Sequence, residues 1–265
     1  SSKSVAFVAG CFSKVHAQYP WRQRLRPSFF GIPASPIGPW FRSGRDQPND
    51  GLQSGHGTYN SKIKAVAPIM SDFTDSSCDF LAENFDRFSS IRREIHMRPE
   101  LAYEETETSA RVAKFLTDID WTVSSGIGGT GIVATLAGGP GPTIGLRADL
   151  DALPIVEKSS VAHCSGYEGK MHACGHDGHI TILLALAELL AREKQRPGDV
   201  HLYFQPAEET GSGAQSMLED GALTRFPCDQ MLGFHNWPAL PFGAISVRQG
   251  VQMSAFQSLE LDFLC

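Results

Sequence analysis

The sequence has 265 residues but no apolar run long enough to cross a membrane. Its longest apolar stretch, ITILLALAELLA, contains Glu188 and is shorter than the ~20 residues that a bilayer span requires. The six cysteines are scattered and include no CxxC pair, which is a poor disulfide framework for a chain of this size. We therefore expect no membrane partner and a reducing compartment, with the cytoplasm as the simplest location.

Other absences remove whole classes of function. There is no GxSxG nucleophile elbow, no GxxxxGK[ST] phosphate-binding loop and no CxxC of the thioredoxin type. Basic residues gather at the start of the chain, where residues 1–50 hold seven Lys or Arg against two Asp or Glu. Because the net charge is −6, the rest of the chain is strongly acidic, which argues against nucleic acid as a partner.

The first 50 residues are rich in Arg, Ser, Pro and aromatic residues and show no sustained helical or strand periodicity. Such a composition is typical of an organelle-targeting peptide, and it is equally that of a disordered or spurious extension, so both alternatives stay open. Residues 51–75 have the composition of a linker. We therefore assign residues 1–75 to a disordered extension and linker, and the folded domain to residues 76–252.

Helical and strand patterns alternate through this domain. Apolar spacing predicts a helix that ends near His96, a second helix within YEETETSARVAKFLTDID, and a third, apolar on nearly all sides, over 178–194. Short runs bounded by glycine or proline predict strands in GIVATLAG, TIGLRADL, DVHLYFQP and QMLGFHN. DVHLYFQP alternates, with Val200, Leu202 and Phe204 on one face and with His201, Tyr203 and Gln205 on the other. The pattern indicates an α/β sandwich with a mainly parallel sheet.

Polar motifs follow three of these strands at the point where each strand ends. RADLD follows TIGL, QPAEE follows HLYF, and HN follows MLGF. In parallel α/β sheets, functional sites collect at the carboxyl ends of the strands. We therefore expect these motifs to meet at one edge of the sheet and to carry the chemistry.

The segment GKMHACGHDGHIT, residues 169–181, concentrates candidate metal ligands. Cys174 and His176 are two residues apart, so in an extended loop both side chains point the same way and can reach one ion. A thiolate and an imidazole together suit zinc or a similar transition metal. His172 and His179 are weaker candidates, because one precedes the pair and the other lies about a turn into the helix. A lone histidine here would more simply cap or pack the helix, but the density of candidates favours a metal.

Carboxylates in the other motifs supply a second component of such a centre. In PAEE, the adjacent Glu208 and Glu209 point in different directions, so one can bind metal while the other takes a proton from water. The alternative is an exposed acidic pair at a helix start. Asp149 and Asp151 could orient an imidazole or form a turn. His235 is either a ligand or a buried core histidine. A purely structural zinc site would leave the acidic pair without a role.

Several long motifs resemble a known family. GLRADLDALPI, GKMHACGHDGH, FQPAEETGSGAQSMLEDGAL and GFHNWPALPFGAISVRQG resemble, nearly word for word, the metal-dependent amidohydrolases of the hippurate hydrolase, N-acyl-L-amino-acid amidohydrolase and indole-3-acetyl-amino-acid hydrolase group. This group lies within the aminoacylase/carboxypeptidase superfamily. IRREIHMRPELAYEE and SGIGGTGIVATL are similar to the family's N-terminal opening. The resemblance runs from about residue 82 to residue 255.

The resemblance implies a three-layer, zinc-exopeptidase-like catalytic domain that hydrolyses the amide bond of N-acyl amino acids with two divalent metal ions (Zn, or Mn, Co or Ni). Glu208 matches the general base that takes a proton from a metal-activated water, and Asp149 matches the aspartate that supports the catalytic machinery. The residues that match metal ligands are Cys174, His176, Glu209 and His235. The residues given only supporting or structural roles are His172, Asp177 and His179.

The resemblance also implies parts that this chain does not contain. Family members insert a lid domain, which often mediates dimerisation, and supply a last histidine ligand near their C-terminus. Residues 253–265 match only the start of that lid. We therefore expect an incomplete catalytic domain in a C-terminally truncated chain. The alternative to an active amidohydrolase is an inactive fragment that binds metal or a partner without turnover.

Replacing Cys174 tests the ligand assignment directly. We expect the Cys174→Ala variant to retain less metal than the unaltered chain, because the thiolate is one of a small set of donors. Metal content is measured by elemental analysis after equilibration with Zn²⁺ or Mn²⁺ and gel filtration. Equal metal content in the two proteins would remove Cys174 from the ligand set.

Overall fold

The computed structural model describes residues 5–7, 67–240 and 245–246, with side chains from residue 76 onward. Helices and strands alternate along this part of the chain, as the sequence predicts. The elements are β1 (Val5–Phe7), α1 (Ala67–His96), α2 (Thr106–Asp118), β2 (Thr122–Ile127), β3 (Gly131–Leu136), β4 (Ile144–Asp149), α3 (His176–Arg192), β5 (Val200–Gln205), α4 (Gly213–Glu219), α5 (Ala222–Arg225) and β6 (Gln230–Gly233).

The strands of the described residues form one sheet in the order β1-β6-β4-β5-β3-β2. β1, β6, β4 and β5 run parallel to one another, whereas β3 is antiparallel to β5 and β2 is antiparallel to β3. The register pairs Asp149 with Gln205 across β4 and β5, and Arg147 with Gly233 across β4 and β6. The carboxyl ends of these three strands therefore lie at one edge of the sheet.

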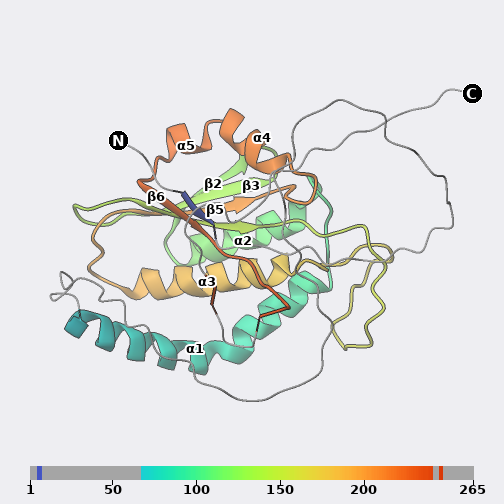
Figure 1. Ribbon diagram of the computed structural model, residues 1–265, viewed down its shortest axis with the longest axis horizontal. Coiled ribbons are helices and arrows are strands. Elements are labelled where there is room, and N and C mark those ends of the chain that lie inside the picture. The colour runs from blue at the N-terminus through green and yellow to red at the C-terminus, as the bar shows by residue number, and fades with distance from the viewer. Residues whose placement is uncertain (1–4, 8–66, 241–244, 247–265) are drawn as a thin grey trace, which may run out of the picture. The chain divides into compact units, whose positions relative to one another are not determined.

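Helices cover both faces of the sheet and give three layers (Figure 1). On one face, α2 and α3 share a hydrophobic core with the sheet that includes Leu183 and Phe204. On the other face, beside α4 and α5, Met217 lies in one cluster with Tyr203. α1 lies outside α3, with Phe88 in the cluster between them (Figure 1). The predicted α/β sandwich is confirmed, with a sheet that is mixed.

β5 is buried on both faces, which fixes where the strand ends. Leu202 and Phe204 belong to the core on the α2–α3 side, and Tyr203 belongs to the cluster on the α4–α5 side, so the predicted alternation is confirmed. His201 is buried as well, with Nδ1 2.8 Å from the hydroxyl oxygen of Thr135 on β3. A slip of one residue would exchange the two faces of this strand. The motif QPAEE is therefore held at the sheet edge by the packing of the strand before it.

The structure differs from the sequence expectations mainly in where the helices and strands begin and end. The helix expected over 178–194 begins at His176 and ends at Arg192. The helix that ends at His96 begins at Ala67, and β1 also lies within the range 1–75 that we expected to be an extension and linker. The remainder of that range and residues 253–265 lie outside the described residues. β2, α4 and α5 were not predicted, because their short sequences mix small and polar residues without a clear period.

Within the part of the chain that the structure describes, no helix has both the length and the apolar character needed to cross a membrane. Even α3, with the most apolar sequence, carries charged side chains at both ends and Glu188 between them.

Two neighbours in α3 provide a matched test of the core. Leu183 is fully buried, whereas Ile182 is 55% exposed. We expect Leu183→Ala to lower the free energy of unfolding by about 2–5 kcal/mol, because it removes buried methyl and methylene groups and leaves a cavity. We expect Ile182→Ala to change it by less than about 0.5 kcal/mol. Urea unfolding followed by circular dichroism measures both, and equal losses would contradict the orientation of α3.

Candidate metal centre

The polar motifs after β4, β5 and β6 meet at the carboxyl edge of the sheet, as predicted. β4 ends at Asp149, β5 ends at Gln205 and β6 ends at Gly233, and α3 begins at the same edge with His176. The guanidinium of Arg147 joins two of these ends. It donates to Gln205 Oε1 at 2.9 Å and to Asp149 Oδ2 at 2.8 Å.

Three of the four predicted ligands lie within reach of one another, and the fourth, His235, lies beside Cys174. Cys174 Sγ, His176 Nε2 and a carboxylate oxygen of Glu209 are all within 4.8 Å of one another. Of these atoms, His176 Nε2 and Glu209 Oε1 are 3.7 Å apart. His235 brings its Nε2 to 3.4 Å from Cys174 Sγ. Donor atoms at such separations can surround one ion at the usual zinc–ligand distances of about 2.0–2.3 Å.

The two imidazoles are oriented so that each turns its Nε2 toward this cluster. His176 Nδ1 lies 2.8 Å from the carbonyl oxygen of Asp151, and His235 Nδ1 lies 2.8 Å from the carbonyl oxygen of Asn236. A carbonyl oxygen can only accept a hydrogen bond, so each Nδ1 donates. Each Nε2 is therefore left as the ring nitrogen that can bind a metal ion.

Two atoms of the cluster have no hydrogen-bond partner among the described residues. His176 Nε2 and Glu209 Oε1 are both buried, and neither is satisfied by another protein group. Buried polar atoms without partners are rare in folded proteins and require an explanation. A divalent cation between them would satisfy both. Thiolate, imidazole and carboxylate donors fit a borderline ion such as Zn²⁺.

A second group of possible ligands overlaps the first and consists of Asp149, His176, His179 and His235. Within it, His179 uses both ring nitrogens on protein groups. Its Nδ1 lies 2.6 Å from Asp149 Oδ1, and its Nε2 accepts from the backbone N–H of Asn236 at 3.0 Å. His179 therefore has no lone pair left for an ion. Its contact with the carboxylate agrees with the supporting role expected for it.

Asp149 places a negative charge beside the cluster. The residue is fully buried, and burial alone would raise the pKa of its carboxyl group. The charge of Arg147 and the two imidazoles nearby outweigh burial and hold that pKa well below its usual range. Its Oδ2 lies 3.5 Å from His176 Nε2. A buried anion next to a set of ligands favours a cation at that point.

The predicted ligands differ in how firmly they hold protons. Burial lowers the pKa of His176, but the charge of Asp149 and the hydrogen bond to Asp151 outweigh it and raise the pKa well above its usual value. Burial raises the pKa of the Cys174 thiol. Burial also lowers the pKa of His235 to about 4, so this imidazole is neutral at physiological pH. A metal ion that binds here has to displace protons from His176 and Cys174.

The two glutamates of PAEE have different surroundings, as predicted. Glu209 turns its Oε1 into the buried cluster, and its backbone N–H donates to Asp151 Oδ2 at 2.9 Å. The Glu208 side chain is 34% exposed, and its Oε2 lies 3.8 Å from His176 Nε2. The rest of this side chain is buried, and its burial raises the pKa of the Glu208 carboxyl group. A carboxylate that lies at the solvent side of these candidate ligands and has a raised pKa is suited to accept a proton from water.

Sequence reasoning gave Asp177 only a supporting or structural role, and it missed the groups that hold Asp177 and the PAEE turn in place. Asp177, in the first turn of α3, accepts hydrogen bonds from Arg92 at 3.0 Å and pairs with His96 Nδ1 at 2.9 Å, which ties the start of α3 to α1. Glu105 is completely buried behind the PAEE turn. Charged residues on an amphipathic helix, or in a run such as YEE, look like solvent-facing positions. Only their burial in the folded chain distinguishes these residues from charged residues that face solvent.

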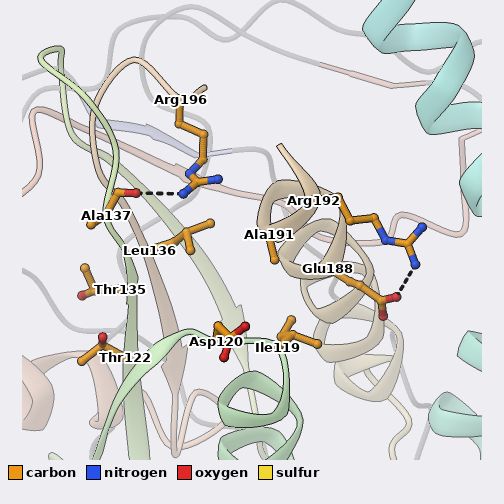
Figure 2. Close-up of a pocket in the computed structure, with 10 residues that line it drawn as sticks. All are labelled: Ile119, Asp120, Thr122, Thr135, Leu136, Ala137, Glu188, Ala191, Arg192 and Arg196. Carbon is orange, nitrogen blue, oxygen red and sulfur yellow. Dashed lines mark hydrogen bonds and ion pairs between the residues drawn. The ribbon is translucent and has the colours of Figure 1, made fainter. Parts of the chain in front are cut away.

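A separate hollow of about 540 Å³ lies at the opposite end of the sheet, beside the end of β3 and the last turns of α3 (Figure 2). Three of its four charged side chains, those of Glu188, Arg192 and Arg196, are engaged by protein groups. Arg192 pairs with Glu188 at 2.9 Å, and Arg196 donates to the carbonyl oxygen of Ala137 at 2.9 Å. None of the residues predicted for the site lines this hollow. The candidate chemistry therefore belongs to the carboxyl edge.

Known proteins have sequences related to that of this chain. The family model described as Peptidase family M20/M25/M40 matches residues 145–262. A hippurate hydrolase from Campylobacter jejuni is 41% identical over 181 residues, which make up 67% of this chain and 46% of the relative. An IAA-amino acid hydrolase (ILR1-like 2) from Arabidopsis thaliana is 44% identical over 169 residues, or 63% of this chain and 38% of the relative. The chain thus spans less than half the length of both relatives.

A solved structure is similar as well. The YXEP protein from Bacillus subtilis, described as a dinuclear metal binding peptidase from the M20 family, aligns with a TM-score of 0.56 and 38% identity. The alignment covers 59% of this chain and 44% of that one. These matches confirm the resemblance that the four long motifs carry.

The protonation of the ligands predicts how metal binding depends on pH. Because the pKa values of His176 and Cys174 are both raised, we expect the apparent Zn²⁺ affinity to increase as pH rises from 6 to 8. Each proton displaced contributes about a tenfold change per pH unit. Calorimetric titrations in buffers of different ionisation enthalpy count the protons released. An affinity that does not vary with pH would contradict these ligand assignments.

Proposed function

We propose that this protein, whose residues 145–262 match the model of Peptidase family M20/M25/M40, hydrolyses the amide bond of N-acyl amino acids in a metal-dependent reaction. One observation carries the proposal. Four side chains from three separate segments, with donor chemistry suited to a divalent metal, converge at the carboxyl edge of the sheet beside Glu208. A bound ion would account for the buried donor atoms that have no protein partner at this point.

We assign four residues as metal ligands, in a centre that takes two divalent ions: Cys174, His176, Glu209 and His235. The unpartnered buried atoms His176 Nε2 and Glu209 Oε1 support this assignment. The description of the similar Bacillus subtilis structure as dinuclear supports the number of ions. Divalent ions supply two kinds of chemistry when bound, since they polarise a carbonyl group and acidify water.

Glu208 is the proposed general base. Its carboxylate stands at the solvent side of the cluster, 3.8 Å from His176 Nε2. It takes a proton from the water whose oxygen attacks the amide carbonyl carbon. As the C–N bond breaks, the same proton passes to the leaving amine, so that a carboxylic acid and an amine are released. Asp149 stays ionised throughout and holds His179 and Arg147 around the centre.

The proposed substrate class follows from what the relatives have in common. The names hippurate hydrolase and IAA-amino acid hydrolase both describe the cleavage of an amide that joins an acyl group to an amino acid. A small N-acyl amino acid carries a carboxylate and one scissile amide. We propose such small molecules as the partners of this site, with residues 76–252 as the part of the chain that forms it.

A hydrolysis assay tests the proposal. The chain is loaded with Zn²⁺ or Mn²⁺ and incubated with hippurate and with N-acetyl amino acids, and the released amino acid is quantified. We expect turnover in the unaltered chain and a loss of about 10²- to 10⁴-fold in Glu208→Gln, because the amide cannot accept the proton. Metal content is expected to be equal in both proteins.

Glu193→Gln is the matched control, because Glu193 lies at the far end of α3 from the centre. We expect this variant to hydrolyse the substrates as the unaltered chain does. Equal turnover in Glu208→Gln would remove Glu208 as the base. Bound metal without any turnover in the unaltered chain would favour the alternative, a chain that binds metal without catalysis.

A further inference from the structure

The turn that presents Glu208 and Glu209 has an unusual backbone. Ala207, directly before the pair, has a φ of 49°, in the left-handed region that residues with a side chain rarely adopt. Ala207 is completely buried. Such a conformation persists only where the surroundings hold it, and it occurs preferentially where function requires it. The side-chain directions of the glutamates therefore depend on whatever stabilises this turn.

One group that stabilises the turn, from far away in the sequence, is the carboxylate of Glu105. Its Oε1 accepts the backbone N–H of Ala207 at 2.8 Å, and its Oε2 accepts the hydroxyl of Thr130 at 2.5 Å. Glu105 is completely buried, and burial raises the pKa of its carboxyl group. A buried carboxylate is costly, so its retention at this point requires specific donors. Hydrogen bonds to a charged acceptor are also about twice as strong as those between neutral groups.

Capping of α2 does not account for this carboxylate. Glu105 occupies the N-cap position of α2, but its side chain makes no capping hydrogen bond. That task falls to Glu100, whose carboxylate accepts from the backbone N–H groups of Glu107 at 2.9 Å and Thr108 at 2.7 Å. The Glu105 side chain reaches away from its own helix to the PAEE turn, 102 residues further along the chain.

The turn is held on both sides of Glu208. The N–H of Ala207 donates to Glu105, and the N–H of Glu209 donates to Asp151 Oδ2 at 2.9 Å. Both acceptors are buried carboxylates. Between them, the Glu208 side chain turns toward solvent and the Glu209 side chain turns toward Cys174 and His176. The contact with Asp151 belongs to the cluster itself, whereas the contact with Glu105 comes from outside it.

We propose that Glu105 is a positioning residue: by holding the left-handed turn at Ala207, its buried carboxylate aims Glu209 at the metal cluster and leaves Glu208 beside it. The proposal rests on the proposed function, in which Glu209 is a metal ligand. Glu105 touches no ligand atom. Its effect on the centre passes entirely through the backbone of Ala207, so it should appear in metal affinity even without any substrate.

A Co²⁺ titration of the full chain tests the proposal, followed by the absorption bands of the metal ion. The test variant combines Glu105→Met with Thr130→Val, which replaces the polar pair by apolar groups of similar size and leaves the Ala207 N–H without its acceptor. We expect this variant to bind Co²⁺ about 10- to 100-fold more weakly, the usual effect of losing a group that orients a ligand. Glu105→Gln keeps a carbonyl oxygen for Ala207, and we expect it to restore affinity to within a few-fold.

Glu100→Ala is the matched control, because it removes a set of contacts with backbone N–H groups at the start of α2 without touching the turn. We expect it to lower the urea midpoint of unfolding and to leave Co²⁺ affinity unchanged. Unchanged affinity in the test variant, or an equal loss in Glu100→Ala, would overturn the role of Glu105 and leave the proposed function standing. A failure of the unaltered chain to bind Co²⁺ would overturn the proposed function itself, and this role with it.

Discussion

One buried charge, the carboxylate of Asp149, organises the carboxyl edge of the sheet. Arg147 reaches it from the same strand and also bonds Gln205 at the end of β5. His179 reaches it from α3 and also accepts from the backbone of Asn236, just beyond β6. A carboxylate removed from water is stable only when it is paired and hydrogen-bonded. These contacts therefore have to exist together, and they tie three strand ends and one helix to a single point.

The hydrophobic core supplies the rigidity on which this arrangement depends. α3 packs its apolar residues, among them Ile180 and Leu183, against the sheet, so the position of its first turn is set by the packing of the turns that follow. His176 and His179 lie in that first turn. Between Cys174 and His176, Gly175 has a φ of 86°, and a Cβ there would lie 2.8 Å from the Asn236 side chain. Glycine adopts this conformation without strain, so the order Cys-Gly-His meets a steric requirement.

The sequence predicted the parts of this protein that depend on short-range pattern. The alternation in DVHLYFQP identified β5, its two faces and the place where it ends, because a strand's side chains alternate regardless of what surrounds them. The positions of RADLD, PAEE and HN at the ends of predicted strands indicated that these motifs would meet, and in the structure they do. Pattern could not distinguish a solvated carboxylate from a buried one. Glu105 and Glu104 are adjacent and identical in type, yet Glu105 is buried under the PAEE turn and Glu104 pairs with Lys170 at the surface.

The sequence by itself therefore determined the fold class, the family resemblance and the identity of the donor atoms at the edge of the sheet. It did so because periodicity and motif spacing are local properties of the chain. Only the tertiary structure decided which of these atoms remain free to bind an ion. His176 and His179 are both histidines of one motif, but the carbonyl of Asp151 leaves Nε2 of His176 unpartnered, whereas Asp149 and Asn236 occupy both nitrogens of His179. That distinction depends on partners tens of residues away, which meet only when the sheet and its helices have packed.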